Sequence, residues 1–205
     1  MATLKDQGST GEKLSRRERN KARTRAAILN AARKGFGRAG IYATTMDEIA
    51  EGAEISRATL FNYFASKTEI VDEIVSLMDD AFMDAIAELC RTIPSIRERT
   101  IAVFDHGANG LDKLGRGAKH LVGYSELAIH EDTGAGRMAR LRAAFSNMLG
   151  YGITDPHETL EHPVIESAVA IYVGIIHNWR ITEDYDLHHH LRRACDLIFC
   201  LMDNE

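Results

Sequence analysis

The chain has 205 residues, of which 45% are hydrophobic, and a formal net charge of −5. That hydrophobic fraction is enough for a substantial core in one or two compact units. No run of 18 or more apolar residues occurs, and the N-terminus lacks the apolar stretch of a signal peptide, so a membrane-spanning or exported chain is not indicated and we expect a cytoplasmic protein.

Charge is unevenly distributed along the chain. Up to Lys67 there are 13 Lys and Arg against 7 Asp and Glu, whereas the remainder has 12 against 23. A basic end on an acidic protein is typical of a phosphate-binding module joined to a different kind of domain. The alternative for the charge alone is an uneven solvated surface.

Residues 1–20 are polar, lack helical periodicity and end in a run of arginines, which predicts a disordered basic arm. A helix is predicted from about Lys21 to Arg38, with Gly40 positioned to end it. The arginines ahead of this helix are expected either to reach phosphates or the adjacent minor groove of DNA, or to be simply solvated.

Two short helices are predicted next. Thr45 and Glu48 form a T-x-x-E capping box, so a helix should begin near Met46. Ser56 is a good N-cap for a second helix, which leaves only about three residues, 53–55, for the turn between them. Two helices joined so closely cross steeply, in the helix-turn-helix geometry whose second helix enters the major groove of DNA.

This segment resembles the DNA-binding domain of the TetR family of bacterial transcription regulators. The family pattern is an I-A pair, then A-G-V-S-K-G-T-L-Y-x-Y/H-F, and then S-K-x-x-L. The chain has Ile49-Ala50, then AEISRATLFNYF over 53–64, and then SKTEI over 66–70. With the preceding helix, the resemblance covers about the first third of the chain.

Three positions depart from the family pattern. Glu54 stands where the family usually has a turn glycine, so a positive φ there would cost about 1 kcal/mol. Ala58 replaces a glycine, and its methyl group is suited to contact a thymine methyl. Asn62 replaces a frequent aromatic residue with an amide that can pair with adenine. These changes affect which operator is read rather than the class of function.

The resemblance implies a DNA-binding domain over residues 21–67 and two kinds of contact. Base edges are expected at Arg57, Ala58, Thr59 and Asn62. Phosphates are expected at Thr44, Thr45, Ser56, Tyr63 and Lys67, with Thr45 and Ser56 also capping their helices.

The remainder, residues 68–205, is predicted to be a helical effector-binding and dimerisation domain, which makes the protein all-α. Ser66 and Glu69 form a second capping box that opens a long helix to about Arg91, ended by Pro94. Further helices are expected at about 95–114, 116–130, 134–150, 158–181 and 186–202, and no alternating strand pattern is present.

The last two predicted helices carry more apolar surface than a terminal hairpin usually buries. In the resembled family such a pair packs against its copy in a second subunit, which implies a homodimer reading a palindrome. The interface is expected at Val164, Ala168, Ile171, Ile175, Leu191 and Ile198. The alternative is that these faces complete the core of the monomer.

The resemblance also implies a ligand-responsive regulator, most often a repressor that a small-molecule effector releases from its operator. An activator or an effector-independent regulator is the alternative. Sites between helices combine an apolar wall with few polar groups. On that basis the effector pocket is predicted at Phe104, His120, Tyr124, Phe145, Tyr172 and His177.

An all-α enzyme or metal-binding protein using the C-terminal histidines is the alternative from another class. Consecutive helical residues such as His188, His189 and His190 point about 100° apart, and no nucleophile or metal motif occurs. We therefore expect no catalytic residue, no metal and no cofactor. The three cysteines are widely spaced and are expected to be reduced, with redox sensing as the alternative.

Overall fold

The computed structural model describes residues 15–127 and 131–204, and every regular element in these ranges is a helix, as predicted. The elements are α1 (Arg16–Ala39), α2 (Met46–Gly52), α3 (Arg57–Phe61), α4 (Lys67–Thr92), α5 (Ile96–Leu114), α6 (Arg116–Leu127), α7 (Glu131–Leu149), α8 (Pro156–Glu161), α9 (Pro163–Ile181) and α10 (Leu187–Met202). None of these helices combines the length and apolarity needed to cross a bilayer.

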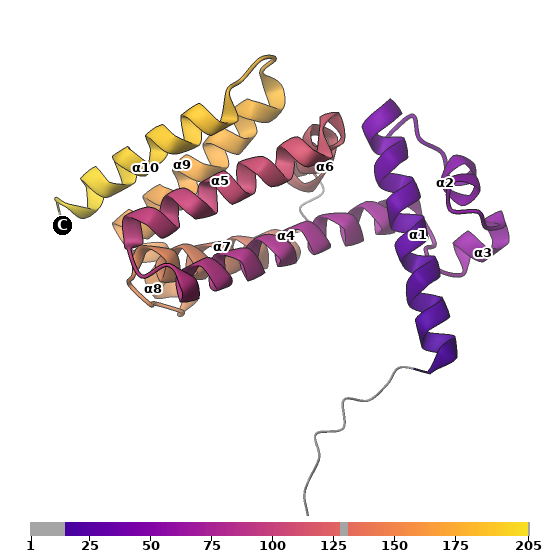
Figure 1. Cartoon of the computed structure of the whole chain (residues 1–205), viewed down its shortest axis with the longest axis horizontal. Coiled ribbons are helices and arrows are strands. Elements are labelled where there is room, and N and C mark those ends of the chain that lie inside the picture. Colours follow the sequence, from indigo (N-terminus) through magenta and orange to yellow (C-terminus); the bar gives the residue numbers. More distant parts are fainter. Residues whose placement is uncertain (1–14, 128–130, 205) are drawn as a thin grey trace, which may run out of the picture.

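The helices form two units that share α4 (Figure 1). In the first unit α1, α2 and α3 enclose a core that the start of α4 completes with Ile70, Val71 and Ile74. In the second unit α5 to α10 and the later part of α4 enclose a separate core, to which Ile86 of α4 belongs. One uninterrupted helix of 26 residues therefore connects them.

A second connection runs through α6, which packs against α1. Leu121 of α6 is buried in the core of the first unit. The two backbones approach closely at paired glycines, because a Cβ added to Gly117 would lie 3.0 Å from the Cα of Gly37. Only glycine allows helices to pack this tightly without side chains between them.

Two predicted boundaries are wrong. The helix expected from about Lys21 begins at Arg16, because Ser15 and Glu18 form a capping box that the sequence analysis missed. The helix expected over 158–181 is divided into α8 and α9 at His162, since Pro163 lacks the amide that a helix interior requires and instead occupies the first turn of α9.

Candidate DNA-binding surface

The caps of the helix-turn-helix form as predicted. The backbone amide of Thr45 donates to Glu48 Oε2 at 2.8 Å, and the amide of Glu48 donates to Thr45 Oγ1 at 3.2 Å. The hydrogen bonds that the amide and the hydroxyl of Thr45 donate to Glu48 Oε2 hold the pKa of the Glu48 carboxyl below its usual value. In α3 the hydroxyl of Ser56 accepts from the amide of Thr59 at 3.0 Å. Each helix start is therefore fixed by its own sequence.

The turn between the two helices is also where it was predicted. Ala53 follows α2, Ser56 precedes α3, and the amide of Ile55 donates back to the carbonyl of Ala50 at 3.0 Å. Glu54 adopts a φ of 56°, the left-handed conformation that glycine would adopt without strain. The backbone strain expected at Glu54, where the family usually has glycine, is thus present.

Of the predicted base-reading residues, Arg57, Ala58 and Asn62 are exposed and Thr59 is half-buried. The guanidinium of Arg57 is not free, because Nη1 lies 2.7 Å from Asp47 Oδ2 of α2. The guanidinium carbon of Arg57, Cζ, also lies 5.5 Å from the centre of the Phe61 ring. To reach a base, Arg57 must leave Asp47.

Phe61 is a surface residue that was not predicted as a DNA contact. Its ring is 41% exposed, on the same side of α3 as Arg57, Ala58 and Asn62. The helical spacing i, i+1, i+4 and i+5 from Arg57 would have identified this face. An exposed apolar ring here is suited to contact thymine methyl groups.

The phosphate contact predicted for Thr44 is wrong. Thr44 is 1% exposed, its hydroxyl donates to the carbonyl of Gly40 at 2.8 Å, and its side chain packs against Gly35 of α1. The residue holds the loop between α1 and α2 against α1. Thr45 and Ser56 remain at exposed helix starts, where phosphates bind favourably.

Lys67 has a structural role that was not predicted. Its ammonium donates to the carbonyl oxygens of Thr44 at 2.9 Å and Tyr42 at 3.1 Å. Lys67 therefore ties the start of α4 to the loop that precedes α2. Any phosphate contact uses the ammonium proton that remains.

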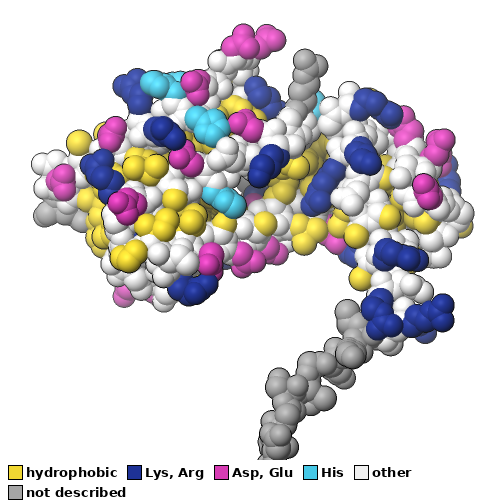
Figure 2. Space-filling model, in the orientation of Figure 1, with side chains coloured by type: hydrophobic (Ala, Val, Ile, Leu, Met, Phe, Trp, Pro, Cys, Tyr) yellow, Lys and Arg dark blue, Asp and Glu magenta, His cyan; other side chains and the backbone are white. Residues whose placement is uncertain are grey.

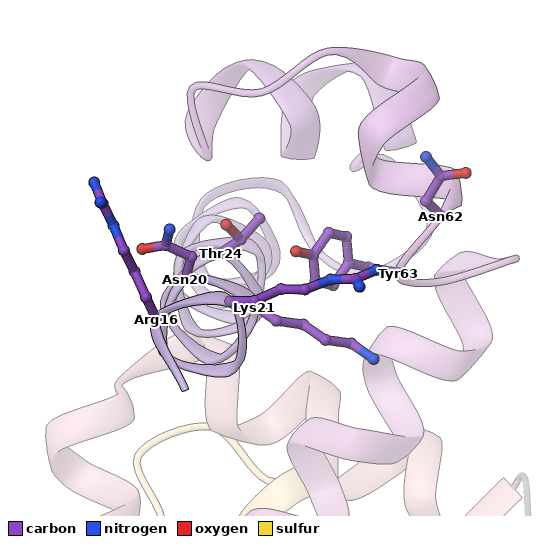
Figure 3. A pocket seen from close by; sticks show the side chains of 7 residues that line it. Arg16, Asn20, Lys21, Thr24, Asn62 and Tyr63 are labelled. Carbon is purple, nitrogen blue, oxygen red and sulfur yellow. The ribbon is translucent and has the colours of Figure 1, made fainter. Parts of the chain in front are cut away.

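Tyr63 is half-buried and lines a groove of about 640 Å³ between the start of α1 and the connection from α3 to α4 (Figure 3). The segment predicted as a disordered arm up to residue 20 forms one side of this groove from Arg16 onward, as helix; residues 1–14 lie outside the described part of the chain. In Figure 2 a cluster of Lys and Arg side chains lies at this projecting end of the molecule.

The residues predicted as an effector pocket do not form one site. Phe104, Phe145 and Tyr172 do meet, but their rings pack on one another with centroids 5.4–5.9 Å apart, and Phe82 stacks on Tyr172 at 5.6 Å. Burial raises the pKa of the Tyr172 hydroxyl above its usual value. These rings fill the interior of the second unit instead of lining a hollow.

The other three residues of that predicted pocket lie elsewhere. His120 is exposed where α6 faces Gly40, and His177 is exposed on the outer side of α9. The side chain of Tyr124 lies outside the described part of the chain. Aromatic and histidine content identified residues of the correct domain but not their neighbours.

Four of the six residues predicted for the dimer interface are instead buried within the monomer. Val164, Ala168, Leu191 and Ile198 are at most 4% exposed and belong to the core of the monomer. Ile171 and Ile175 are half-buried. The exposed faces of the same helices carry Ala170, Val173 and Gly174 on α9 and Leu197 on α10. A hollow of about 640 Å³ between α7 and α9 lies on this surface.

The histidines and cysteines have ordinary surroundings. His188 Nε2 lies 2.9 Å from Asp112 Oδ2, and the His190 ring stacks on Tyr185. Within residues 15–127 and 131–204 no three His, Cys, Asp or Glu side chains are placed to hold a metal ion. The cysteines are free, and burial raises the pKa of the Cys195 thiol to about 12.

Comparison with known proteins agrees with this geometry. Residues 28–74 match the family model described as bacterial regulatory proteins, tetR family. The HTH-type transcriptional regulator TcmR of Streptomyces glaucescens is 37% identical over 70 residues, which cover 34% of this chain and 31% of TcmR. The matched part thus spans less than a third of that relative's length.

Solved structures resemble nearly the whole chain. The FadR repressor of Thermus thermophilus, in complex with lauroyl-CoA, is 20% identical, covers 85% of this chain and 93% of its own, and has a TM-score of 0.60. The complex of triclosan with SmeT, a repressor from Stenotrophomonas maltophilia, is 22% identical, covers 87% and 90%, and has a TM-score of 0.63. Residues 28–74 thus match the DNA-binding domain of the tetR family of bacterial regulators, and the chain as a whole has the fold of these solved TetR-family structures.

Proposed function

We propose that the protein is a sequence-specific DNA-binding regulator of transcription, acting on cytoplasmic DNA. The observation that carries this proposal is α3, a capped helix whose exposed face presents Arg57, Ala58, Phe61 and Asn62 beside a strongly basic helix start. Such a face has the donors and apolar groups that read base edges in the major groove. Thr45, Ser56 and Tyr63 are positioned around it for phosphates.

The test is selection of bound duplexes from a random-sequence DNA library by the purified protein. A base-reading α3 should enrich one motif strongly over the starting pool. Recovery of unselected sequence, with affinity set only by salt, would contradict sequence-specific binding.

We further propose that the regulator is a homodimer. The exposed apolar stripe of α9, together with Leu197 of α10, is the surface that a second copy would cover. The small side chains of Ala170 and Gly174 support close packing, and a Cβ added to Gly174 would meet nothing within 4 Å in the monomer. A two-fold axis here would give a palindromic operator, so the selected motif should be an inverted repeat.

The proposed mode of regulation is repression relieved by a small, mostly apolar molecule bound in the second unit. The lauroyl-CoA and triclosan complexes of FadR and SmeT support an effector of this kind. An effector acts only through different affinities for the DNA-binding and released arrangements. It should therefore weaken operator binding about 5- to 150-fold, and the operator should weaken effector binding by the same factor. Equal effector affinity with and without operator would leave an activator or an effector-independent regulator.

A further inference from the structure

The start of α1 projects from the first unit as an exposed basic helix. The capping box of Ser15 and Glu18 begins the helix at Arg16, while the first buried residue is Ile28. In Figure 1 this end of α1 extends beyond α2 and α3. Between 16 and 25 there are six Arg or Lys and one Glu. A solvated helix start needs no such concentration of one charge, since like charges on neighbouring turns repel.

Every side chain that lines the groove beside this helix can donate a hydrogen bond. The lining side chains are Arg16, Arg17, Asn20, Lys21, Thr24, Asn62 and Tyr63. Three carry a positive charge, the other four offer an N–H or O–H, and no carboxylate is among them. Figure 3 shows Asn20, Thr24 and Lys21 of α1 next to Tyr63, with Arg16 at one end and Asn62 at the other. This chemistry is complementary to an anion that offers several acceptor oxygens along its length.

Helical structure at the start of α1 decides between two ways of meeting DNA. An α-helix with its side chains is about 10–12 Å wide, whereas the minor groove is about 6 Å wide. The segment from Arg16 cannot therefore lie within the minor groove as an extended arm would. Its side chains are left to contact the sugar-phosphate backbone from outside.

The position of the groove beside α3 also favours a contact with the sugar-phosphate backbone of the DNA that α3 reads. Asn62, which follows α3, lines both the groove and the exposed face that reads bases. A duplex contacted by α3 therefore passes the groove within one side chain of that contact. Arg25 does not take part, because its guanidinium pairs with Glu73 and lies 4.5 Å from the centre of the Phe64 ring.

We propose that this groove, with Arg17 and Lys21 as its main charges, binds the phosphate backbone next to the bases read by α3. The proposal rests on the proposed DNA-binding function and adds to it a contribution to affinity that does not depend on the DNA sequence. Each phosphate neutralised releases counterions and contributes about −0.9 to the slope of log affinity against log salt.

The experiment compares two pairs of substitutions in the full chain, Arg17→Gln with Lys21→Gln and Arg19→Gln with Arg23→Gln. Each pair removes two positive charges from the same exposed stretch of α1, but Arg19 and Arg23 do not line the groove. Glutamine is a good helix former, so both variants should melt like the wild type. Affinity is measured over a range of salt concentrations for a random-sequence duplex and for a duplex selected by the wild type.

The groove pair should weaken both duplexes by a similar factor, roughly tenfold near 0.15 M salt, and make the slope shallower by about 2 per bound protomer. The control pair should change the slope much less. Equal losses in the two pairs, an unchanged slope in the groove pair, or a loss confined to the selected duplex would each overturn the proposal. Wild-type protein that enriches no duplex from the library and does not bind the random-sequence duplex would instead overturn the proposed function, and the groove with it.

Discussion

Asn62 stands at the end of α3 with its amide exposed, where a bidentate pairing with adenine is geometrically available. Replacing it with alanine should relax the preference at one base pair by about 1–3 kcal/mol, because that pairing is lost. Affinity for random-sequence DNA should change little. Motifs selected by the two proteins from one library provide the measurement, and identical motifs would show that Asn62 does not read a base.

Lys67 leads to a different expectation from a simple phosphate contact. Lys67→Met should lower the free energy of unfolding by about 1 kcal/mol, since the carbonyls of Tyr42 and Thr44 lose a charged donor. Urea unfolding measures this change. Lys34→Met, at an exposed position of α1, is the control and should have almost no effect. If both variants unfold alike, the role of Lys67 lies in DNA contact alone.

Individual residues of the helix-turn-helix were predictable where their partners are near in sequence. Thr45 meets Glu48, and Ser56 meets Thr59, so local spacing sufficed. Thr44 was misassigned because its partners include Gly35, nine positions away on another helix. Its burial depends on how α1 and the following loop pack, which no local pattern records.

At the scale of the helices, the contact of α6 with α1 is sensitive to a single added atom. A Cβ on Gly117 would meet the Cα of Gly37 at 3.0 Å, and backbone cannot move aside as a side chain can. Gly117→Ala should therefore destabilise the protein by about 1–3 kcal/mol, even though alanine favours helix.

Gly110→Ala is the matched control for that change. Gly110 lies in α5, and an added Cβ would meet nothing within 4 Å. Alanine there should stabilise the protein by about 0.5–1 kcal/mol through helix propensity alone. Thermal unfolding of both variants gives the comparison, and two changes of the same sign would mean that the α1–α6 contact yields easily.

Helix positions in the second unit followed from caps and periodicity, but their covered faces did not. Ser95 accepts from the amide of Glu98 and begins α5 as predicted. On α9, however, apolar residues occur on nearly every side, and the single apolar face of α10 could be covered either by the monomer or by a second copy. Periodicity therefore could not show that Ile198 is fully buried in the monomer. Which neighbour covers a face is decided by tertiary packing.

For the whole molecule, the exposed stripe gives a test of assembly that the buried residues would not. Val173→Glu with Leu197→Glu should yield folded monomers, because these side chains are 36% and 51% exposed and their replacement leaves the core intact. A charge covered without a partner by a second copy would be strongly unfavourable. Sedimentation at several concentrations measures the assembly state.

Leu160→Glu on α8 is the control for this pair, since Leu160 is 47% exposed and lies outside the stripe. It should leave assembly unchanged. A folded dimer in the doubly substituted protein would place the subunit interface on another surface. Loss of dimerisation should also lower the affinity for a palindromic duplex, since the two recognition helices then bind independently.

The stacked rings of Phe82, Phe104, Phe145 and Tyr172 bear on how fast any ligand can enter the second unit. An interior ligand must wait for the rings to part, so its apparent affinity is reduced by the small fraction of molecules that are open. The observed association rate should then rise with ligand concentration and level off at the rate of ring opening. A ligand seated on the outer surface would show no such plateau, and stopped-flow measurement of the Trp179 fluorescence would distinguish the two routes.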